Sequence, residues 1–294
     1  TVLYLNLTKF KNAGLPTDAE HLPKTWKEIE EAARKLKAAG EVCPMTTSWI
    51  GWTQLESFST WHNVEYATKN NGFGGLDARL MINSPLHQRH LENLERWNKE
   101  GLFVYKGRGN HADASFYSGE CAITMGSSGT LANIRRNAKF EYATSTLPYY
   151  EGTPDAPQNT AIGGASLWAM AGKPDAENRC VAEFFNFLSD PKVQAANHQR
   201  TGYLPVTMKA FELSKESGYY DKNPGSDVAV KQMLKTTEKS RGIRLGNLPA
   251  IRTIVDEEFE KIWAGKASAK DALATVVERG NAELTKFERQ QSRK

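Results

Sequence analysis

The sequence predicts an α/β fold, and three observations lead to that prediction. Short apolar segments with the character of strands, such as residues 121–125, alternate with segments whose apolar residues recur at helical spacing. Several joins between them are rich in glycine, and no internal repeat or low-complexity tract occurs. A chain of 294 residues can also bury enough apolar surface for one large domain or two smaller ones. Strands that alternate with helices are typical of an α/β architecture.

Composition argues against two classes of protein. The 38 basic and 34 acidic residues give a net charge of +4 and are spread along the chain, whereas a nucleic-acid binder needs a concentrated basic face. No apolar run approaches the roughly 20 residues of a membrane span. Residues 1–6 have the character of a strand already in progress, so we expect the sequence to be part of a longer protein.

The predicted elements follow local signals. A capping box at 25–28, in which a hydroxyl and a carboxylate satisfy two helix N–H groups, starts a helix that ends at Gly40. Ser84 and Pro85 start an amphipathic helix that runs to Gly101. The other predicted elements are a strand at 140–147, and helices at 7–13, from 173, from 190, and at 225–234, 249–263 and 268–288.

The three cysteines are odd in number and widely separated. Cys43, Cys121 and Cys180 show neither CxxC nor metal-ligand spacing. We expect them to be buried small hydrophobic residues, and the sequence predicts neither a metal site nor a cofactor.

Trp49 and Trp52 stand in a stretch that also contains serine, threonine and glycine, just before a helical pattern. Three residues apart, they would project to the same side of a helical turn. They are either a pair of core tryptophans or, in a loop or first turn, the aromatic wall of a binding site.

Ser127 lies in a small-residue turn between the strand 121–125 and a helix. Unpaired N–H groups and the helix dipole favour an anion at such a join. An ordinary serine N-cap is the alternative, and the turn is not a P-loop because the Gly-Lys-Ser/Thr ending is missing.

Four further residues each allow a purely structural role as an alternative to ligand binding. Gly163 and Gly164 permit close approach to the main chain, and the apolar residues after them suit a buried strand, but the pair alone is compatible with a bend. Tyr203 sits in a tight turn, where a surface or half-buried phenol is the alternative to a ligand contact. Arg252 opposes the dipole in the first turn of its helix, so either a bound anion or a salt bridge accounts for it.

The residues that could perform catalysis form no recognisable constellation. His87 and His90 lie in a segment rich in charged residues and are expected on a solvated surface, as is the acidic run 256–258. No G-x-S-x-G or H-E-x-x-H motif occurs, so a binding protein is favoured over an enzyme. A phosphodiester or glycoside hydrolase would need a metal cluster or two facing carboxylates, such as Glu56 or Asp256 opposite another acid.

Six segments together resemble one family, and they occur in the family's order. They are PKTW at 23–26, SWIGW at 48–52, SSG at 127–129, GGASLW at 163–168, TGYLP at 201–205 and RLGN at 244–247. They resemble the periplasmic sn-glycerol-3-phosphate-binding proteins of ABC importers, within the extracellular solute-binding group that includes maltose-binding protein. The resemblance spans nearly the whole chain.

The resemblance implies a type II periplasmic fold, in which two α/β lobes close on a ligand about a hinge. Residues 1–162 would form the first part of the C-terminal lobe, 163–205 the hinge strand and the remaining part of the N-terminal lobe, and 206–294 the closing helices of the C-terminal lobe. In the family a further N-terminal segment precedes the strand at Thr1 and supplies ligand contacts, and this sequence lacks it.

The resemblance also implies a function. The chain would be a monomeric periplasmic, or extracellular membrane-associated, protein that captures sn-glycerol 3-phosphate or a glycerophosphodiester for permease subunits in the membrane. A receptor for a sugar or oligosaccharide is the alternative, which the tryptophans favour. The ligand-binding residues that the resemblance implies are Trp49, Trp52, Ser127, Gly164, Tyr203 and Arg252.

Overall fold

A four-stranded mixed sheet lies at the centre of the protein. The computed structural model describes residues 1–292, with strands β1 (Val2–Asn6), β2 (Cys43–Thr47), β3 (Cys121–Gly126) and β4 (Tyr142–Ser145) in the order β2-β3-β1-β4. β2 and β3 are parallel, whereas β1 runs antiparallel to both β3 and β4. Every residue of β1, β2 and β3 is buried, so these strands are covered on both faces. The predicted α/β class is confirmed.

Helices surround this sheet, and the local start signals are confirmed where they were clearest. Thr25 Oγ1 accepts from Glu28 N (3.2 Å), and Glu28 Oε2 accepts from Thr25 N (2.9 Å), which completes the capping box. The helices are α1 (Leu7–Asn12), α2 (Trp26–Ala38), α3 (Ser57–Trp61), α4 (Thr68–Asn71), α5 (Pro85–Lys99), α6 (His111–Tyr117), α7 (Leu131–Asn137), α8 (Asp175–Ser189), α9 (Pro191–Thr201), α10 (Met208–Glu216), α11 (Tyr219–Lys222), α12 (Val228–Met233), α13 (Leu248–Trp263) and α14 (Ala269–Gln291), with short turns η1 (Trp52–Glu56) and η2 (Ser128–Thr130).

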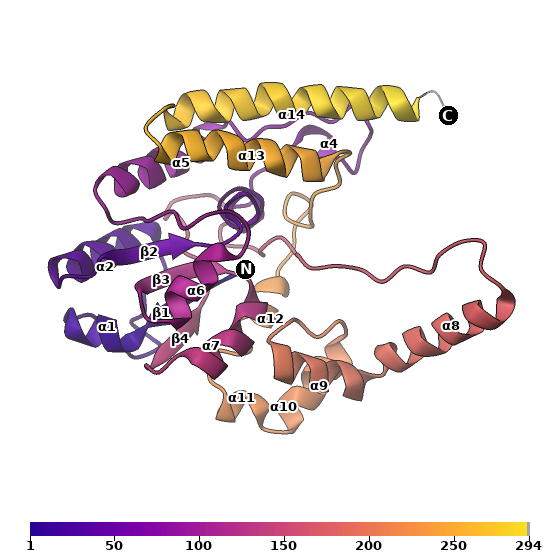
Figure 1. Ribbon diagram of the computed structural model, residues 1–294, viewed down its shortest axis with the longest axis horizontal. Coiled ribbons are helices and arrows are strands. Elements are labelled where there is room, and N and C mark those ends of the chain that lie inside the picture. The colour runs from indigo at the N-terminus through magenta and orange to yellow at the C-terminus, as the bar shows by residue number, and fades with distance from the viewer. Residues whose placement is uncertain (293–294) are drawn as a thin grey trace.

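The sheet and its helices enclose a large apolar core. Leu3 and Leu5 of β1 contribute to it from one face of the sheet, together with Phe259 of α13. Tyr4, between those two leucines, points to the opposite face and packs in a smaller cluster with Phe116 of α6. Figure 1 shows α13 and α14 lying side by side, with α5 beside them. We call residues 1–161 and 191–292 the body. The body therefore buries its apolar faces against its own elements.

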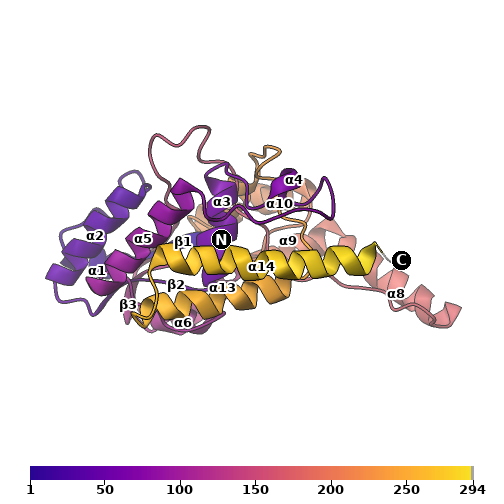
Figure 2. The ribbon, with the colours of Figure 1, turned by 90° about the horizontal axis from the view of Figure 1, so that it is seen from above.

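The arm, which we define as residues 162–190, is different. Residues 162–174 form neither a helix nor a paired strand, and α8 contains no buried residue. Trp168 is 82% exposed. In Figures 1 and 2 the arm runs out from the body, and α8 lies at the far edge of the molecule. The prediction of a buried strand after the glycine pair is therefore wrong, because no strand within residues 1–292 pairs with it or covers it.

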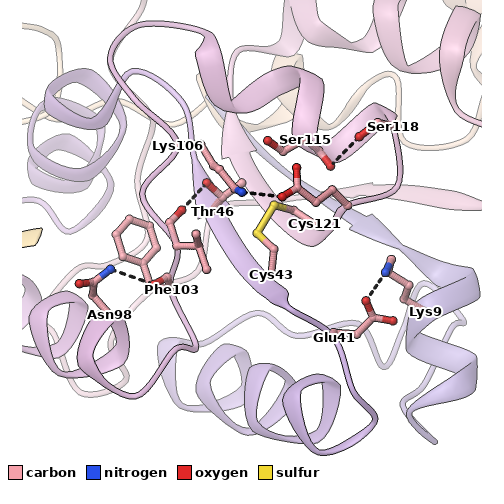
Figure 3. The surroundings of a disulfide bond; sticks show 12 residues. Lys9, Glu41, Cys43, Thr46, Asn98, Phe103, Lys106, Ser115, Ser118 and Cys121 are labelled. Carbon is pink, nitrogen blue, oxygen red and sulfur yellow. Dashed lines mark hydrogen bonds and ion pairs between the residues drawn. A yellow bond between two sulfur atoms is a disulfide. The ribbon is translucent and has the colours of Figure 1, made fainter.

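The three cysteines were expected to be buried small hydrophobic residues, and this is confirmed only for the burial of Cys43 and Cys121. Cys43 and Cys121 are register partners at the starts of the parallel strands β2 and β3, and they form a disulfide with Cα atoms 4.5 Å apart (Figure 3). Seventy-eight positions separate them in the sequence, so only the assembled sheet brings them together. Cys180, on α8, is an exposed free thiol.

His87 and His90 are buried, not solvated as their charged surroundings suggested. Ser84 Oγ and Ser59 Oγ lie 2.6 and 2.8 Å from the two ring nitrogens of His87. The His90 ring stacks on Phe58, with centroids 4.0 Å apart. Neutral imidazoles suit these positions because their polar atoms find partners within the core.

The acidic run 256–258 is not wholly solvent-exposed either. The side chain of Glu258 is 3% exposed, and it pairs with Lys261 at 2.7 Å and with Arg279 at 2.5 Å. Two cations therefore compensate for the burial of this carboxylate.

Candidate functional site

Trp49 is a loop residue with an exposed ring. It follows β2 by two residues and has φ of 51°, which is rare outside glycine and asparagine. Its backbone N–H donates to Gly109 O (2.7 Å), and the indole is 46% exposed. Of the two interpretations left open by the sequence, the loop applies to Trp49 and the core tryptophan does not.

Trp52 is partly buried and lies against the glycine pair. It is the first residue of the π-helical turn η1, and its Nε1 donates to Ala161 O (3.1 Å). A Cβ atom on Gly163 would overlap the Trp52 ring, so the packing requires glycine at this position. Gly164 has φ of 106° and open space around it. Of the two glycines, Gly163 is the one that packs against Trp52, a ligand-binding residue that the resemblance implies.

Ser127 caps the turn η2, so the ordinary serine N-cap, one of the two alternatives that the sequence left open, is confirmed. Its Oγ accepts from Gly129 N (3.1 Å), which occupies the hydroxyl oxygen with a backbone donor. The ring of Tyr203 lies on the α-carbon of Gly129, since a Cβ there would stand 3.0 Å from Tyr203 Cζ. The structure therefore brings Ser127 and Tyr203 together through Gly129.

His198 holds the Tyr203 turn in place. Its Nδ1 lies 2.6 Å from Tyr203 O, and its Nε2 lies 2.9 Å from Tyr220 Oη. Burial lowers the pKa of His198, so the ring is neutral; Nδ1 then donates to the carbonyl and Nε2 accepts from the phenol. The exposed Tyr203 ring thus stands on a turn fixed by partly buried hydrogen bonds.

Asp113 is a buried carboxylate that connects two site loops. Thr130 Oγ1 of η2 donates to its Oδ2 (2.8 Å), and Ser48 Oγ, next to Trp49, donates to its Oδ1. Burial raises the pKa of Asp113, while both hydroxyl hydrogen bonds act in the opposite direction. Sequence reasoning missed this residue because nothing in its neighbourhood along the chain marks it.

Arg252 forms a salt bridge, which is one of the two explanations that the sequence allowed. Its Nε and Nη2 donate to Glu56 Oε1 and Oε2 at 2.6 and 2.7 Å, a bidentate pair. The hydrogen bonds to Glu56 raise the pKa of Arg252 above its usual value. Glu56 closes η1 one turn after Trp52, so the turn that carries the indole also anchors the guanidinium.

Contacts thus gather the implied residues into two groups. Ser127 and Tyr203 meet at Gly129, and Asp113 joins that turn to the Trp49 loop. Trp52 and Arg252 are connected through η1, which Thr53 ties back to the Trp49 loop by a bond from its N–H to Trp49 O (2.8 Å). Gly164 stands apart from both groups, because its α-carbon faces open space.

Other kinds of site find no support in the part of the chain that the structure describes. Residues 1–292 contain no group of three histidine, cysteine, aspartate or glutamate side chains that could hold a metal ion. Within the same residues, no helix combines the length and the apolar character needed to cross a membrane.

Comparison with known sequences identifies relatives across almost the whole chain. The profile of the family described as bacterial extracellular solute-binding protein matches residues 1–226. The chain is 51% identical over 289 residues to the sn-glycerol-3-phosphate-binding periplasmic protein UgpB of Yersinia enterocolitica, covering 98% of this chain and 65% of that protein. It is 50% identical over 290 residues to UgpB of Escherichia coli K12, covering 98% and 66%. The chain therefore spans about two thirds of the length of these relatives.

Solved structures of two-lobed binding proteins share the fold. The crystal structure of UgpB from Mycobacterium tuberculosis in complex with glycerophosphocholine aligns with a TM-score of 0.79 at 23% identity, covering 99% of this chain and 69% of that one. The maltose-bound MalE3 of T. maritima aligns with a TM-score of 0.75 at 15% identity, covering 95% and 69%. The sequence match over most of the chain and the shared fold agree, and the chain belongs to the bacterial extracellular solute-binding protein family.

Proposed function

We propose that this chain is the substrate-binding component of an ABC importer and that it captures sn-glycerol 3-phosphate or a glycerophosphodiester. The observation that carries the proposal is the identity of 50–51% with proteins named for binding sn-glycerol 3-phosphate, sustained over 98% of the chain. The relatives' names also place them in the periplasm, which is where we propose that this protein works, delivering its ligand to membrane permease subunits.

The proposed ligand site is Trp49, Trp52, Ser127, Gly164, Tyr203 and Arg252. The geometry supports it in part, because the exposed Trp49 and Tyr203 rings stand on loops that Asp113 and Gly129 connect. An indole face suits the C–H surface of a glycerol, whereas the phenol and guanidinium can donate to phosphate oxygens. We keep Gly164 in the site as an open stretch of main chain, next to the glycine on which Trp52 packs.

We further propose the lobe assignment that the resemblance implies, with 163–205 in the hinge strand and in part of a second lobe, between the 1–162 and 206–294 portions of the C-terminal lobe. The apolar surface of the arm supports it. Leu167, Trp168 and Met170 are exposed along one extended segment, and Phe184 and Phe187 are exposed on α8. Several large apolar side chains exposed in one segment are typical of a face that another part of a protein covers.

We propose that the chain has no catalytic activity. Two acids near the tryptophans, Glu56 and Asp113, are already engaged. Glu56 is held by the Arg252 fork, and both oxygens of Asp113 accept from hydroxyls. A facing pair of free carboxylates, which a glycosidase needs, is not formed by these residues.

Calorimetric titration of glycerol phosphates tests the proposal. The protein to use is the extended protein, by which we mean this chain preceded by the N-terminal segment that the resemblance implies, taken from the Escherichia coli relative. We expect it to bind sn-glycerol 3-phosphate or glycerophosphocholine, and Arg252→Ala to weaken binding by about a hundredfold, because a charge-assisted contact is lost. Arg34→Ala removes an exposed arginine of another ion pair, on α2, and should leave affinity unchanged.

Two results would count against the proposal in different ways. An extended protein that binds neither glycerol phosphate contradicts the function. Binding that Arg252→Ala leaves intact contradicts the site. The exposed Trp49 ring favours one other ligand class, a sugar, and competition by maltose but not by glycerol phosphates would decide for it.

A further inference from the structure

The burial of the two partners in the Glu56–Arg252 pair is unequal. The Glu56 side chain is 4% exposed, whereas the Arg252 side chain is 45% exposed. Glu56 is also fixed within its own turn, because its neighbours Gln54 and Leu55 are buried in the core. A buried, fixed anion thus holds a guanidinium that solvent and ligands can reach.

The geometry of the pair determines which donors of Arg252 remain. A guanidinium has five N–H donors in one plane, and Glu56 takes the edge formed by Nε and one hydrogen of Nη2. The two hydrogens of Nη1 and the second hydrogen of Nη2 remain, and none of them donates to a partner among residues 1–292. One hydrogen of Nη1 and the second hydrogen of Nη2 form the end-on edge, which can donate two parallel bonds to a phosphate.

We propose that Glu56 is a positioning residue for ligand binding, which fixes Arg252 so that its end-on edge faces the anionic group of the ligand. This inference rests on the proposed function, in which Arg252 contacts a phosphate. Orientation, and not attraction by net charge, is then the contribution of the pair, since the carboxylate already balances the guanidinium. A freely rotating arginine would lose more side-chain freedom on binding.

Replacing Glu56 separates orientation from charge because the two effects have opposite signs. Glu56→Gln removes one negative charge beside Arg252. If Glu56 only balanced charge, an anionic ligand would then bind more tightly. If Glu56 positions the guanidinium, binding weakens even though the local charge becomes more positive, and we expect a loss of about tenfold from a misaligned charge-assisted bond.

The experiment is calorimetric titration of glycerophosphocholine and of sn-glycerol 3-phosphate into the extended protein and its variants. Glu257→Gln is the matched control. It removes one negative charge, as Glu56→Gln does, and it lies on α13, the helix that carries Arg252. The pair that it breaks, however, is with Arg279. We expect Glu257→Gln to leave affinity within about twofold, since a partly exposed pair contributes little. Affinity that is unchanged or tighter in Glu56→Gln would overturn the inference.

A second variant serves if Glu56→Gln does not fold. Arg252→Lys keeps the positive charge at a half-exposed position but cannot present a planar edge. We expect it also to bind about tenfold more weakly, and an affinity equal to that of the parent would contradict the role of orientation. If the parent protein binds neither ligand, the proposed function itself has failed. If the parent binds and the variants bind equally well, only the positioning role of Glu56 is contradicted.

Discussion

The body and the arm both contain helices with an apolar side, but they bury those sides very differently. Phe259 on α13 is fully buried, whereas Phe184 on α8 is 52% exposed. Both lie on helices of similar length with an apolar side. An apolar pattern therefore predicts a surface that must be covered, but the element that covers it depends on the rest of the fold.

The largest effect that follows from this comparison is on core packing. Phe259→Ala should lower the free energy of unfolding by about 3–5 kcal/mol, because it removes a large buried side chain and leaves a cavity. Phe184→Ala, at the equivalent chemical change, should alter it by less than about 0.5 kcal/mol. Urea denaturation followed by tryptophan fluorescence measures both.

Equal losses of stability in the two variants would contradict the difference in packing between the body and the arm. They would mean that α8 packs against the body of the isolated chain in solution, so that the arm and the body unfold as one unit. A small loss in both would instead mean that the core around Phe259 relaxes to fill the space.

A second, smaller effect distinguishes the cysteines of the two regions. Cys43→Ser with Cys121→Ser removes the link between β2 and β3 and should cost about 2–4 kcal/mol, since the unfolded chain gains freedom over a long loop. Cys180→Ser, on exposed α8, should be neutral. Thermal unfolding with and without reductant checks this, and a reductant effect that persists in the double variant would contradict the assignment of the disulfide.

Local rules predicted much of the fold. The helix start at Thr25 and the one at Ser84 follow from side chains that cap nearby N–H groups, and such contacts lie within a few residues of each other. The disulfide, the burial of His87 and the exposure of the arm could not be predicted in this way. Each depends on which distant segment lies alongside, and a sequence pattern does not contain that information.

The candidate site shows the same limit. Residue types in loops indicated Trp49, Ser127 and Tyr203, and the structure places all three on loops or turns. The partner of Arg252 was left open, because Glu56 lies 196 positions away and no local signal relates the two. The one available hint was a lone carboxylate in an otherwise uncharged helical stretch, which requires a cation if it is buried.

The last prediction concerns acid, to which the body should respond and the arm should not. Burial lowers the pKa of His62 to about 4 and that of His87 to about 3, and α8 contains no histidine. His62 is fixed in its neutral form by geometry as well, since its Nε2 accepts from Tyr150 N (3.0 Å) while its Nδ1 lies 2.8 Å from Phe58 O.

The sign follows from proton binding. Well above pH 6.5, the ordinary pKa of histidine, neither the folded nor the unfolded state protonates these rings, so their full contribution is present. As the pH falls below that value the unfolded chain binds protons that the folded core rejects, and stability drops by about 1.4 kcal/mol per pH unit for each ring. The loss continues until the pH reaches the folded pKa values, about 4 for His62 and about 3 for His87.

Urea denaturation at pH 6.5 and 5.5 isolates this effect, because carboxylates with ordinary pKa values stay ionised over that interval. His62→Gln should reduce the slope of stability against pH by about one histidine's share. A slope in His62→Gln equal to that of the parent would show that the buried histidines are not what makes the body sensitive to acid, and would remove this distinction between body and arm.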